Sequence, residues 1–274
     1  MSASTSHFLR STTPGGPQLH VQSMGDEGAE RTLVVVHGYG EHGGRYVARM
    51  QAMVEAGWRV LLVDVRGHGR SGGRRGFVER FDDYLSDLDA VFAHFELSQV
   101  STALLGHSHG GLISIRYLQT RPHAVAAAYI TSPLLGIAVQ APAWKESLGR
   151  LMSRLAPRIS LPGEIEADWV CRDPEVVRAY TSDPLNHHIV NARWYTEAVA
   201  AMDAAFEGPA PEVPTRLEQA GADKLVSAAR SEAWARAKGV PFVMHPEHYH
   251  ELIFEADGAE RVAEARAHFE EHIG

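Results

Sequence analysis

Six short runs of apolar residues recur along the chain, and most are separated by stretches whose apolar residues repeat at helical spacing. The runs are rich in Val and Leu and mostly do not alternate with polar residues, which is typical of strands buried on both faces. They cover residues 32–37, 58–64, 101–107, 125–132, 213–220 and 240–245. Strands that alternate with helices predict an α/β fold with a mostly parallel, doubly wound sheet.

Helical spacing and turn residues add further elements to this sheet. The predicted helices cover residues 46–56, 82–95, 110–119 and 259–272. In the second of these, we expect Asp82, Asp83, Asp87 and Asp89 to form a solvated face. Residues 7–24 predict two short strands with a turn at Pro14–Pro17.

The alternation breaks between residues 136 and 208, where prolines are scattered and no strand is convincing. We expect a helical cap at 136–208, inserted into a core made of residues 1–135 and 209–274. Within the cap, residues 144–159 place apolar side chains on one helical face and basic side chains elsewhere. This face either packs on the sheet or meets lipid, with the basic side chains near anionic headgroups.

Charge and composition limit the classes of partner. A net charge of -8 over 274 residues argues against nucleic acid, because phosphate binding needs clustered Lys and Arg. No apolar run approaches the roughly 18 residues of a membrane span, and the first residues do not resemble a signal peptide. The single cysteine, Cys171, excludes an internal disulfide. We expect a cytoplasmic protein, with peripheral membrane contact through residues 144–159.

The third run leads into Gly106-His107-Ser108-His109-Gly110, a G-x-S-x-G sequence between a predicted strand and a predicted helix. A sharp turn there exposes the serine hydroxyl above the sheet, and glycines remove side chains that would collide across the turn. The following helix offers unpaired N–H groups and its positive end to an oxyanion. We therefore predict that Ser108 is a nucleophile.

A serine nucleophile needs a base, and the base needs an orienting acid. In this fold class the acid and then the histidine follow the serine, each in a loop after a strand. Asp223 follows the run 213–220, and His250 lies in the loop after the last run. The weaker candidates are Asp203 and Asp257 for the acid, and His248 and then His245 for the base.

The glycine-rich loop after the first run has two incompatible interpretations. Residues 38–43 read G-x-G-x-x-G, and Asp64 ends the next run, near the spacing of the acid that binds a nicotinamide ribose. That pattern predicts a dehydrogenase, which would leave Ser108, Asp223 and His250 without a role. In a hydrolase, the same loop supplies an N–H group to the oxyanion, and we favour this interpretation.

Together these blocks resemble the monoacylglycerol lipase and lysophospholipase group of α/β-hydrolase-fold serine hydrolases. The blocks, in chain order, are HGYGEHGGRY at 37–46, DVRGHGRS at 64–71, GHSHGG at 106–111, DPEVVRAYTSDPL at 173–185, GAD at 221–223 and YHE at 249–251. The resemblance extends in register over nearly the whole chain. It implies an α/β-hydrolase fold with a helical cap, and hydrolysis of single-chain lipid esters without a cofactor.

The resemblance also implies roles for single residues. Ser108, Asp223 and His250 would form the catalytic triad, and the backbone N–H groups of Tyr39 and His109 would form the oxyanion hole. The residue after the serine is often Met in this group and is His109 here, which puts the lipid headgroup in question. So does Ile253, at a position where some members carry a second histidine.

Two further pairs of residues follow from the resemblance. Glu41 and Arg45 would bind the substrate at the polar end of the pocket, near the glyceryl or headgroup moiety. Arg216 and Glu218 stand in a run that is usually apolar in this group, and at period two they share one side of the strand. We expect these last two side chains to form an ion pair.

Sixteen histidines raise the question of a metal, but no pair matches H-E-x-x-H, and we expect no catalytic metal. The candidate ligand groups are His107-x-His109, His187-His188 and His245-x-x-His248-x-His250.

Alternative functions on the same fold are a serine aminopeptidase, a general short-chain carboxylesterase and a ligand-binding protein without hydrolytic activity.

Overall fold

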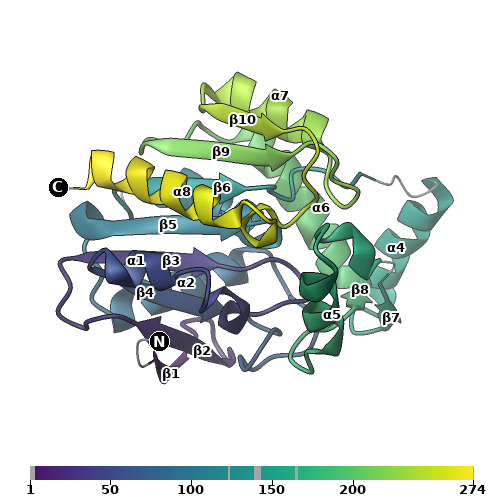
Figure 1. Ribbon diagram of the computed structural model, residues 1–274. Coiled ribbons are helices and arrows are strands. Elements are labelled where there is room, and N and C mark those ends of the chain that lie inside the picture. Colours follow the sequence, from purple (N-terminus) through teal and green to yellow (C-terminus); the bar gives the residue numbers. More distant parts are fainter. Residues whose placement is uncertain (1–3, 123, 139–142, 164–165, 274) are drawn as a thin grey trace.

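An eight-stranded sheet forms the centre of the computed structural model, which describes residues 4–122, 124–138, 143–163 and 166–273, with the backbone alone at 143–148 and 161–162. The strand order is β1-β2-β4-β3-β5-β6-β9-β10. Strand β2 pairs antiparallel with β1 and β4, and the other pairs are parallel, as predicted. The strands are β1 (Ser4–Arg10), β2 (Gln18–Met24), β3 (Arg31–Val36), β4 (Trp58–Asp64), β5 (Thr102–His107), β6 (Ala127–Thr131), β9 (Thr215–Ala220) and β10 (Phe242–His245) (Figure 1).

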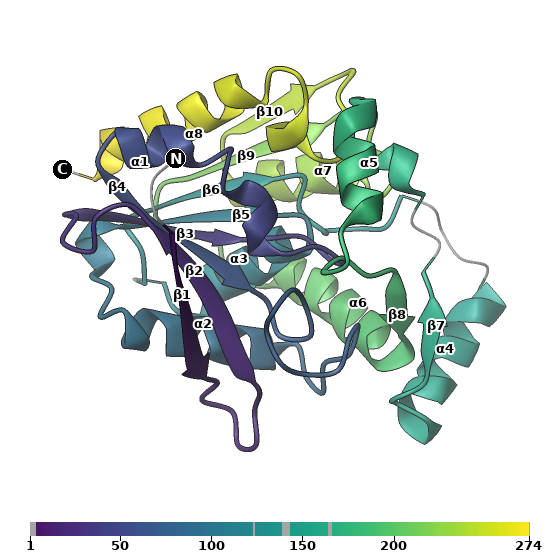
Figure 2. The same ribbon diagram turned by 60° about the horizontal axis from the view of Figure 1, so that its bottom comes forward.

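Helices cover both faces of this sheet (Figures 1 and 2). Neighbouring residues of β3 enter different cores because successive side chains of a strand point to opposite faces. Val34 and Val36 pack with α2 and α3, whereas Leu33 and Val35 pack with α1 and α8. The helices of the core are α1 (Gln51–Glu55), α2 (Asp82–His94), α3 (His109–Thr120), α7 (Ala228–Lys238) and α8 (Gly258–His272), with short 3-10 turns η1 (Gly43–Tyr46), η2 (Gln99–Ser101) and η4 (Leu252–Phe254).

Two predictions about core helices need correction. The helix expected over 46–56 is shorter than predicted, because residues 47–50 form a turn after η1 and α1 begins only at Gln51. In α2, the expected solvated face is wrong for Asp83 and Asp87, which are buried. Both carboxylates pair with Arg66: Asp83 Oδ2 lies 3.3 Å from Arg66 Nη1, and Asp87 Oδ1 lies 2.6 Å from Arg66 Nη2.

The cap is the segment between β6 and β9, which lies beyond the carboxyl ends of the parallel strands (Figure 1). The expectation that it contains no strand is wrong, because β7 and β8 form an antiparallel pair. These strands have three residues each, which is too short to produce a recognisable pattern. The cap elements are α4 (Ala143–Leu155), β7 (Ser160–Pro162), η3 (Ala167–Trp169), α5 (Pro174–Ser182), β8 (Ile189–Asn191) and α6 (Ala192–Glu207).

Helix α4 packs along α6, where the Ser153 Oγ and Thr196 Oγ1 atoms are 2.8 Å apart. The hypothesis that its apolar face packs on the sheet is wrong for the side chains that the structure describes. Leu151 is 51% exposed and Leu155 is 74% exposed. Trp144 and Leu148, which the sequence placed on the same face, lie outside the described side chains.

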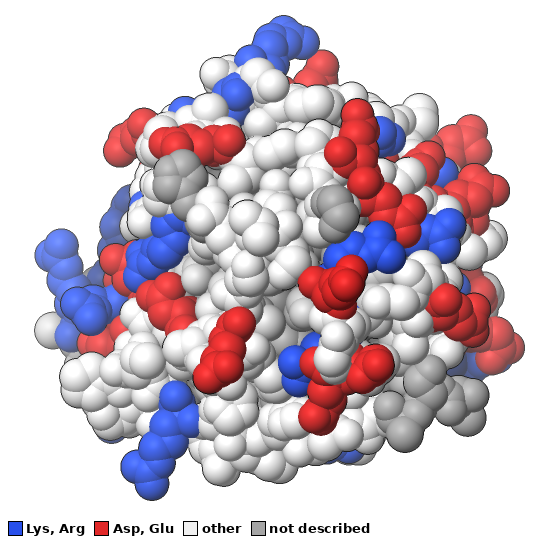
Figure 3. Space-filling model, turned by 90° about the vertical axis from the view of Figure 1, so that its left-hand side faces the viewer, with Lys and Arg blue, Asp and Glu red and all other residues white. Residues whose placement is uncertain are grey.

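The molecular surface away from the cap carries interspersed acidic and basic side chains (Figure 3). Among the helices in the described ranges, none is long and apolar enough to cross a membrane.

Candidate active site

Ser108 lies in the turn between β5 and α3 and has φ 53° and ψ -115°. Few residues other than glycine adopt a positive φ, so this backbone is strained and must be held by its surroundings. The Ser108 N–H donates to the Thr131 carbonyl at 3.0 Å, and the Ser108 carbonyl accepts from the Leu134 N–H at 2.9 Å. Strands β5 and β6 therefore fix the strained turn at the carboxyl edge of the sheet.

The two glycines of the G-x-S-x-G sequence are required by close backbone contacts. A Cβ atom at Gly106 would lie 2.7 Å from the Gly110 carbonyl oxygen, and one at Gly110 would lie 2.1 Å from the Val36 oxygen. A Cβ atom at Gly38 would lie 3.2 Å from the Ser108 Cβ. The glycine-rich loop after β3 is thus packed directly against Ser108.

The structure brings together the predicted acid and the first-ranked base. His250 Nδ1 lies 2.7 Å from Asp223 Oδ2, and the two side chains are 6% and 0% exposed. The other carboxylate oxygen of Asp223 accepts from the Leu225 and Val226 N–H groups at 2.8 and 3.0 Å. These bonds fix the carboxylate, and the carboxylate orients the imidazole.

The two alternative histidines have other partners. His248 Nε2 lies 2.8 Å from Asp257 Oδ1, and His245 Nε2 lies 3.0 Å from Glu218 Oε2. Glu218 also forms the expected ion pair with Arg216, at 2.9 Å. This buried network around Glu218 stabilises a carboxylate inside the sheet and leaves His250 as the histidine that contacts Asp223.

Electrostatics distinguish His250 from its neighbour His107. Burial alone would lower the pKa of His250, but the Asp223 charge and its hydrogen bond outweigh burial and raise it. Burial lowers the pKa of His107 to about 3, so this ring is neutral. His107 Nδ1 lies 3.1 Å from Thr131 Oγ1, and its ring centroid is 4.8 Å from that of His250.

The loop after β3 leaves one of its N–H groups available beside Ser108. The Gly38 N–H donates to Glu41 Oε1 at 2.6 Å, and the Tyr39 N–H has no backbone acceptor within the described ranges. His109 is the first residue of α3, where helical N–H groups lack an intrahelical acceptor. Tyr39 and His109 therefore each offer an N–H group on the side of the sheet where Ser108 lies.

Glu41 and Arg45, the predicted substrate-binding pair, lie in a buried ion-pair network. The Arg45 guanidinium donates to Glu41 Oε2 and, at 2.6 and 2.7 Å, to both carboxylate oxygens of Glu251. Burial alone would raise the pKa of Glu41, but Arg45 and the hydrogen bond from Gly38 keep it below its ordinary value. Glu251 directly follows His250 and belongs to the YHE block of the resemblance, but no role was predicted for it.

The cap contacts both residues that offer these N–H groups. The Trp194 ring lies over the Tyr39 ring with centroids 3.9 Å apart, and the Trp194 indole N–H donates to His109 Nε2 at 3.3 Å. The Tyr39 hydroxyl donates to the Ile189 carbonyl at 2.6 Å. Trp194 could not be predicted from the sequence, because its partners are more than eighty residues away along the chain.

The dehydrogenase interpretation of the same loop fails at Asp64. Its carboxylate accepts from the Gly43 and Arg70 N–H groups, both at 2.8 Å, and lies 2.9 Å from His20 Nδ1. The carboxylate therefore holds the loop through these hydrogen bonds, and Asp64 as a whole is only 1% exposed. It is not placed to bind a ribose hydroxyl.

The described residues contain one group with metal-ligand spacing, formed by Glu41, His107 and Glu251. Arg45 already binds both carboxylates. A cation would compete with this guanidinium, so the group fits an internal ion-pair network better than a metal site.

Known proteins resemble the chain over most of its length. Residues 27–257 match the family described as serine aminopeptidase, S33. The phospholipase YtpA of Bacillus subtilis is 27% identical and covers 88% of this chain and 95% of its own length. The monoglyceride lipase of Rattus norvegicus is 32% identical, over 77% of this chain and 71% of its own.

A solved structure extends this likeness to the fold. The monoacylglycerol lipase of Paleococcus ferrophilus superposes with a TM-score of 0.84 and 26% identity, covering 92% of this chain and 98% of its own. The match spans both the sheet and the cap segment. The protein therefore belongs to the serine aminopeptidase S33 family of α/β-hydrolase-fold serine hydrolases.

Proposed function

We propose that the protein hydrolyses carboxylic esters of single-chain lipids, such as monoacylglycerols or lysophospholipids, through an acyl-enzyme on Ser108. The observation that carries the proposal is the 2.7 Å contact between His250 and Asp223 in a chain whose serine lies in a strained strand–turn–helix connection. The relatives named phospholipase, monoacylglycerol lipase and monoglyceride lipase support a lipid ester as the substrate.

In the first step, Ser108 Oγ attacks the ester carbonyl carbon while its proton moves to His250 Nε2. Asp223 binds the opposite ring nitrogen and stabilises the imidazolium. The negative charge moves to the carbonyl oxygen, where the Tyr39 and His109 N–H groups stabilise it. The tetrahedral intermediate then expels the alcohol, which takes the proton from His250, and an acyl-enzyme remains.

In the second step, water attacks the acyl carbonyl carbon and gives a proton to His250. The same two N–H groups stabilise the second oxyanion. The bond to Ser108 Oγ then breaks, the serine regains its proton from His250, and the fatty acid leaves. Each turnover consumes one water and needs no cofactor.

We infer that Glu41 and Arg45 position the glycine-rich loop at 38–43, the oxyanion loop, and also bind the glyceryl or headgroup moiety of the substrate. Glu41 accepts a hydrogen bond from the Gly38 N–H. This bond orients the backbone so that the next N–H group, that of Tyr39, points away from the loop interior. Arg45 holds Glu41 in place and links it to Glu251, the neighbour of His250. The network thereby connects the oxyanion loop to the base.

The same network argues against the aminopeptidase alternative. A site for a substrate amine needs an acid that is not already neutralised. Glu41 and Glu251 are the carboxylates beside the base, and both bind Arg45. Asp223 binds His250. These acids are all occupied, which favours an uncharged ester.

We further propose that the cap meets the lipid surface on which such substrates reside. Among the described side chains of the cap, the large apolar ones that are exposed are Leu151, Leu155, Ile159 and Ile189. Arg154 lies in the last turn of α4, where a basic side chain can reach anionic headgroups.

A substrate panel tests the proposed activity. We expect turnover of monoacylglycerols or lysophospholipids, and weaker turnover of the same acyl groups on short alcohols. Rates for different acyl-chain lengths at one headgroup measure the selectivity for the acyl chain. Rates for different headgroups at one chain length measure the selectivity for the headgroup. Hydrolysis of amino-acyl arylamides without hydrolysis of acyl glycerols would instead support the aminopeptidase.

A further inference from the structure

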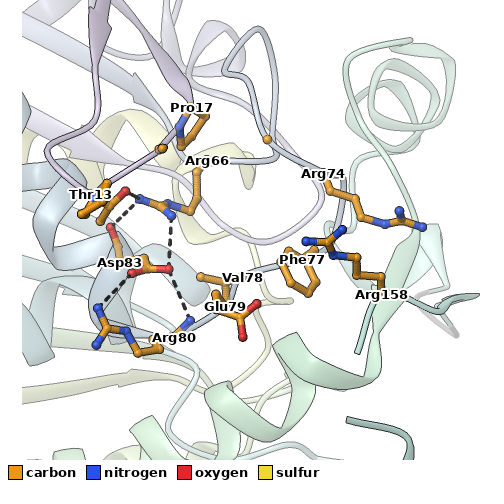
Figure 4. Close-up of a pocket in the computed structure, with 14 residues that line it drawn as sticks. Thr13, Pro17, Arg66, Arg74, Phe77, Val78, Glu79, Arg80, Asp83 and Arg158 are labelled. Carbon is orange, nitrogen blue, oxygen red and sulfur yellow. Dashed lines mark hydrogen bonds and ion pairs between the residues drawn. The ribbon is translucent and has the colours of Figure 1, made fainter. Parts of the chain in front are cut away.

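A pocket of about 700 Å³ opens at the border of the core and the cap (Figure 4). Its wall combines the β1–β2 turn at Thr13–Pro17, part of the loop between β4 and α2, and Arg158, which follows α4. Ser108, Asp223 and His250 are not among the described residues that line it. The pocket is therefore separate from the proposed triad.

Four arginines and two acids line this pocket, and both acids already have partners. The Asp83 carboxylate lies 3.3 Å from Arg66 and 3.8 Å from Arg80, and the Glu79 carboxylate lies 3.6 Å from Arg193. The pocket thus has an excess of positive charge in a chain whose net charge is -8. Such local charge attracts anions.

Arg74 from the core and Arg158 from the cap carry this excess. Both residues are exposed, and within the described ranges neither guanidinium has an acid at ion-pair distance. Figure 4 shows both side chains on the same side of the pocket, with Arg158 next to Phe77. Two like charges repel one another, and an anion between them offsets this repulsion by attracting both, so the arrangement favours a bound anion.

We propose that this pocket binds a phosphate group between Arg74 and Arg158. The planar guanidinium fork matches two phosphate oxygens, and a phosphate has enough oxygens to bind two forks at once. The neighbour of Arg158, Ile159, is 46% exposed, so the pocket borders the apolar face of the cap. The phosphate is either that of a soluble phosphate monoester or that of a phospholipid headgroup.

The test compares the variant Arg74→Gln/Arg158→Gln with wild type and with the matched control Arg70→Gln/Arg178→Gln. The control also removes one exposed arginine from the core and one from the cap, and neither lines the pocket. Glycerol 3-phosphate is the soluble probe, followed by titration calorimetry. Vesicles of phosphatidylcholine, with or without phosphatidylglycerol, are the lipid probe, followed by co-sedimentation.

We expect wild type and control to bind at least one probe, and the Arg74→Gln/Arg158→Gln variant to bind it at least about tenfold more weakly. Binding of glycerol 3-phosphate identifies a soluble ligand, and binding only to vesicles with phosphatidylglycerol identifies a lipid headgroup. Hydrolysis of a short soluble ester should stay unchanged in all three proteins, which shows that they are folded. Equal binding by variant and control, or binding of neither probe by wild type, would overturn the proposal.

Discussion

As the proposed base, His250 can accept the proton of Ser108 only when its imidazole is neutral, so the His250 pKa should set the acidic limb of activity. The Asp223 charge raises that pKa above the ordinary value of 6.5 despite burial. As pH falls through this raised pKa, the base becomes protonated and hydrolysis is lost. We expect the acidic limb of kcat/KM, measured with an uncharged short ester, to have its midpoint above pH 6.5.

The variant Asp223→Asn provides the comparison for this pH profile. It removes the charge that raises the His250 pKa, so the remaining activity should be low and its acidic midpoint should move to lower pH. A midpoint that stays in place or rises in Asp223→Asn would show that another group controls the profile.

At the residue scale, the sequence predicted the parts of the site that short motifs encode. Ser108 is marked by its flanking glycines, and Asp223 and His250 by their positions after apolar runs; the structure brings the last two together. Glu251 and Trp194 could not be predicted in the same way, because their roles depend on partners that only the folded chain brings near. Asp83 looked solvated because its partner, Arg66, is also distant in sequence.

Trp194 connects helix α6 of the cap to the oxyanion loop. The variant Trp194→Phe should keep the ring against Tyr39 but lose the indole N–H that binds His109. Because the backbone of His109 is one proposed oxyanion donor, we expect kcat for a short soluble ester to fall about three- to tenfold with little change in KM. Steady-state kinetics at saturating and limiting ester separate the two constants.

Trp169→Phe is the matched control, since Trp169 is a cap tryptophan in η3. It should leave kcat unchanged. If both variants lower kcat equally, or if Trp194→Phe changes KM alone, the indole N–H does not position the oxyanion hole.

Elements were predictable where packing imposes a pattern. Strands β3, β4 and β5 are buried on both faces, so their apolar runs are continuous and unambiguous. Helix α7 was not predicted, because only Ser231, Trp234 and Ala235 are buried along it. The exposed apolar side chains of α4 gave a clear helical pattern without revealing what they contact.

For the whole molecule, the exposed apolar face of the cap should decide how the enzyme reaches lipid. Leu155→Asn should weaken association with phosphatidylcholine vesicles by about tenfold, because burial of a leucine side chain stabilises association by roughly 1.5–3 kcal/mol. Turnover of a short soluble ester should not change. Co-sedimentation with vesicles measures the effect.

Val100→Asn is the control for this experiment. Val100 and Leu155 are both 74% exposed, but Val100 lies in η2 of the core, far along the chain from the cap. Equal weakening by the two substitutions would contradict a specific lipid-facing role for the cap.

The central claim is that one serine, held in the strained turn between β5 and α3, performs the chemistry. Its most direct test is the initial rate of monoacylglycerol hydrolysis by Ser108→Ala, with the melting temperature measured in parallel. We predict a rate at least about ten-thousandfold below wild type and an unchanged melting temperature, because the substitution removes only the hydroxyl oxygen. A folded Ser108→Ala protein that still hydrolyses monoacylglycerol within about tenfold of the wild-type rate would contradict the claim.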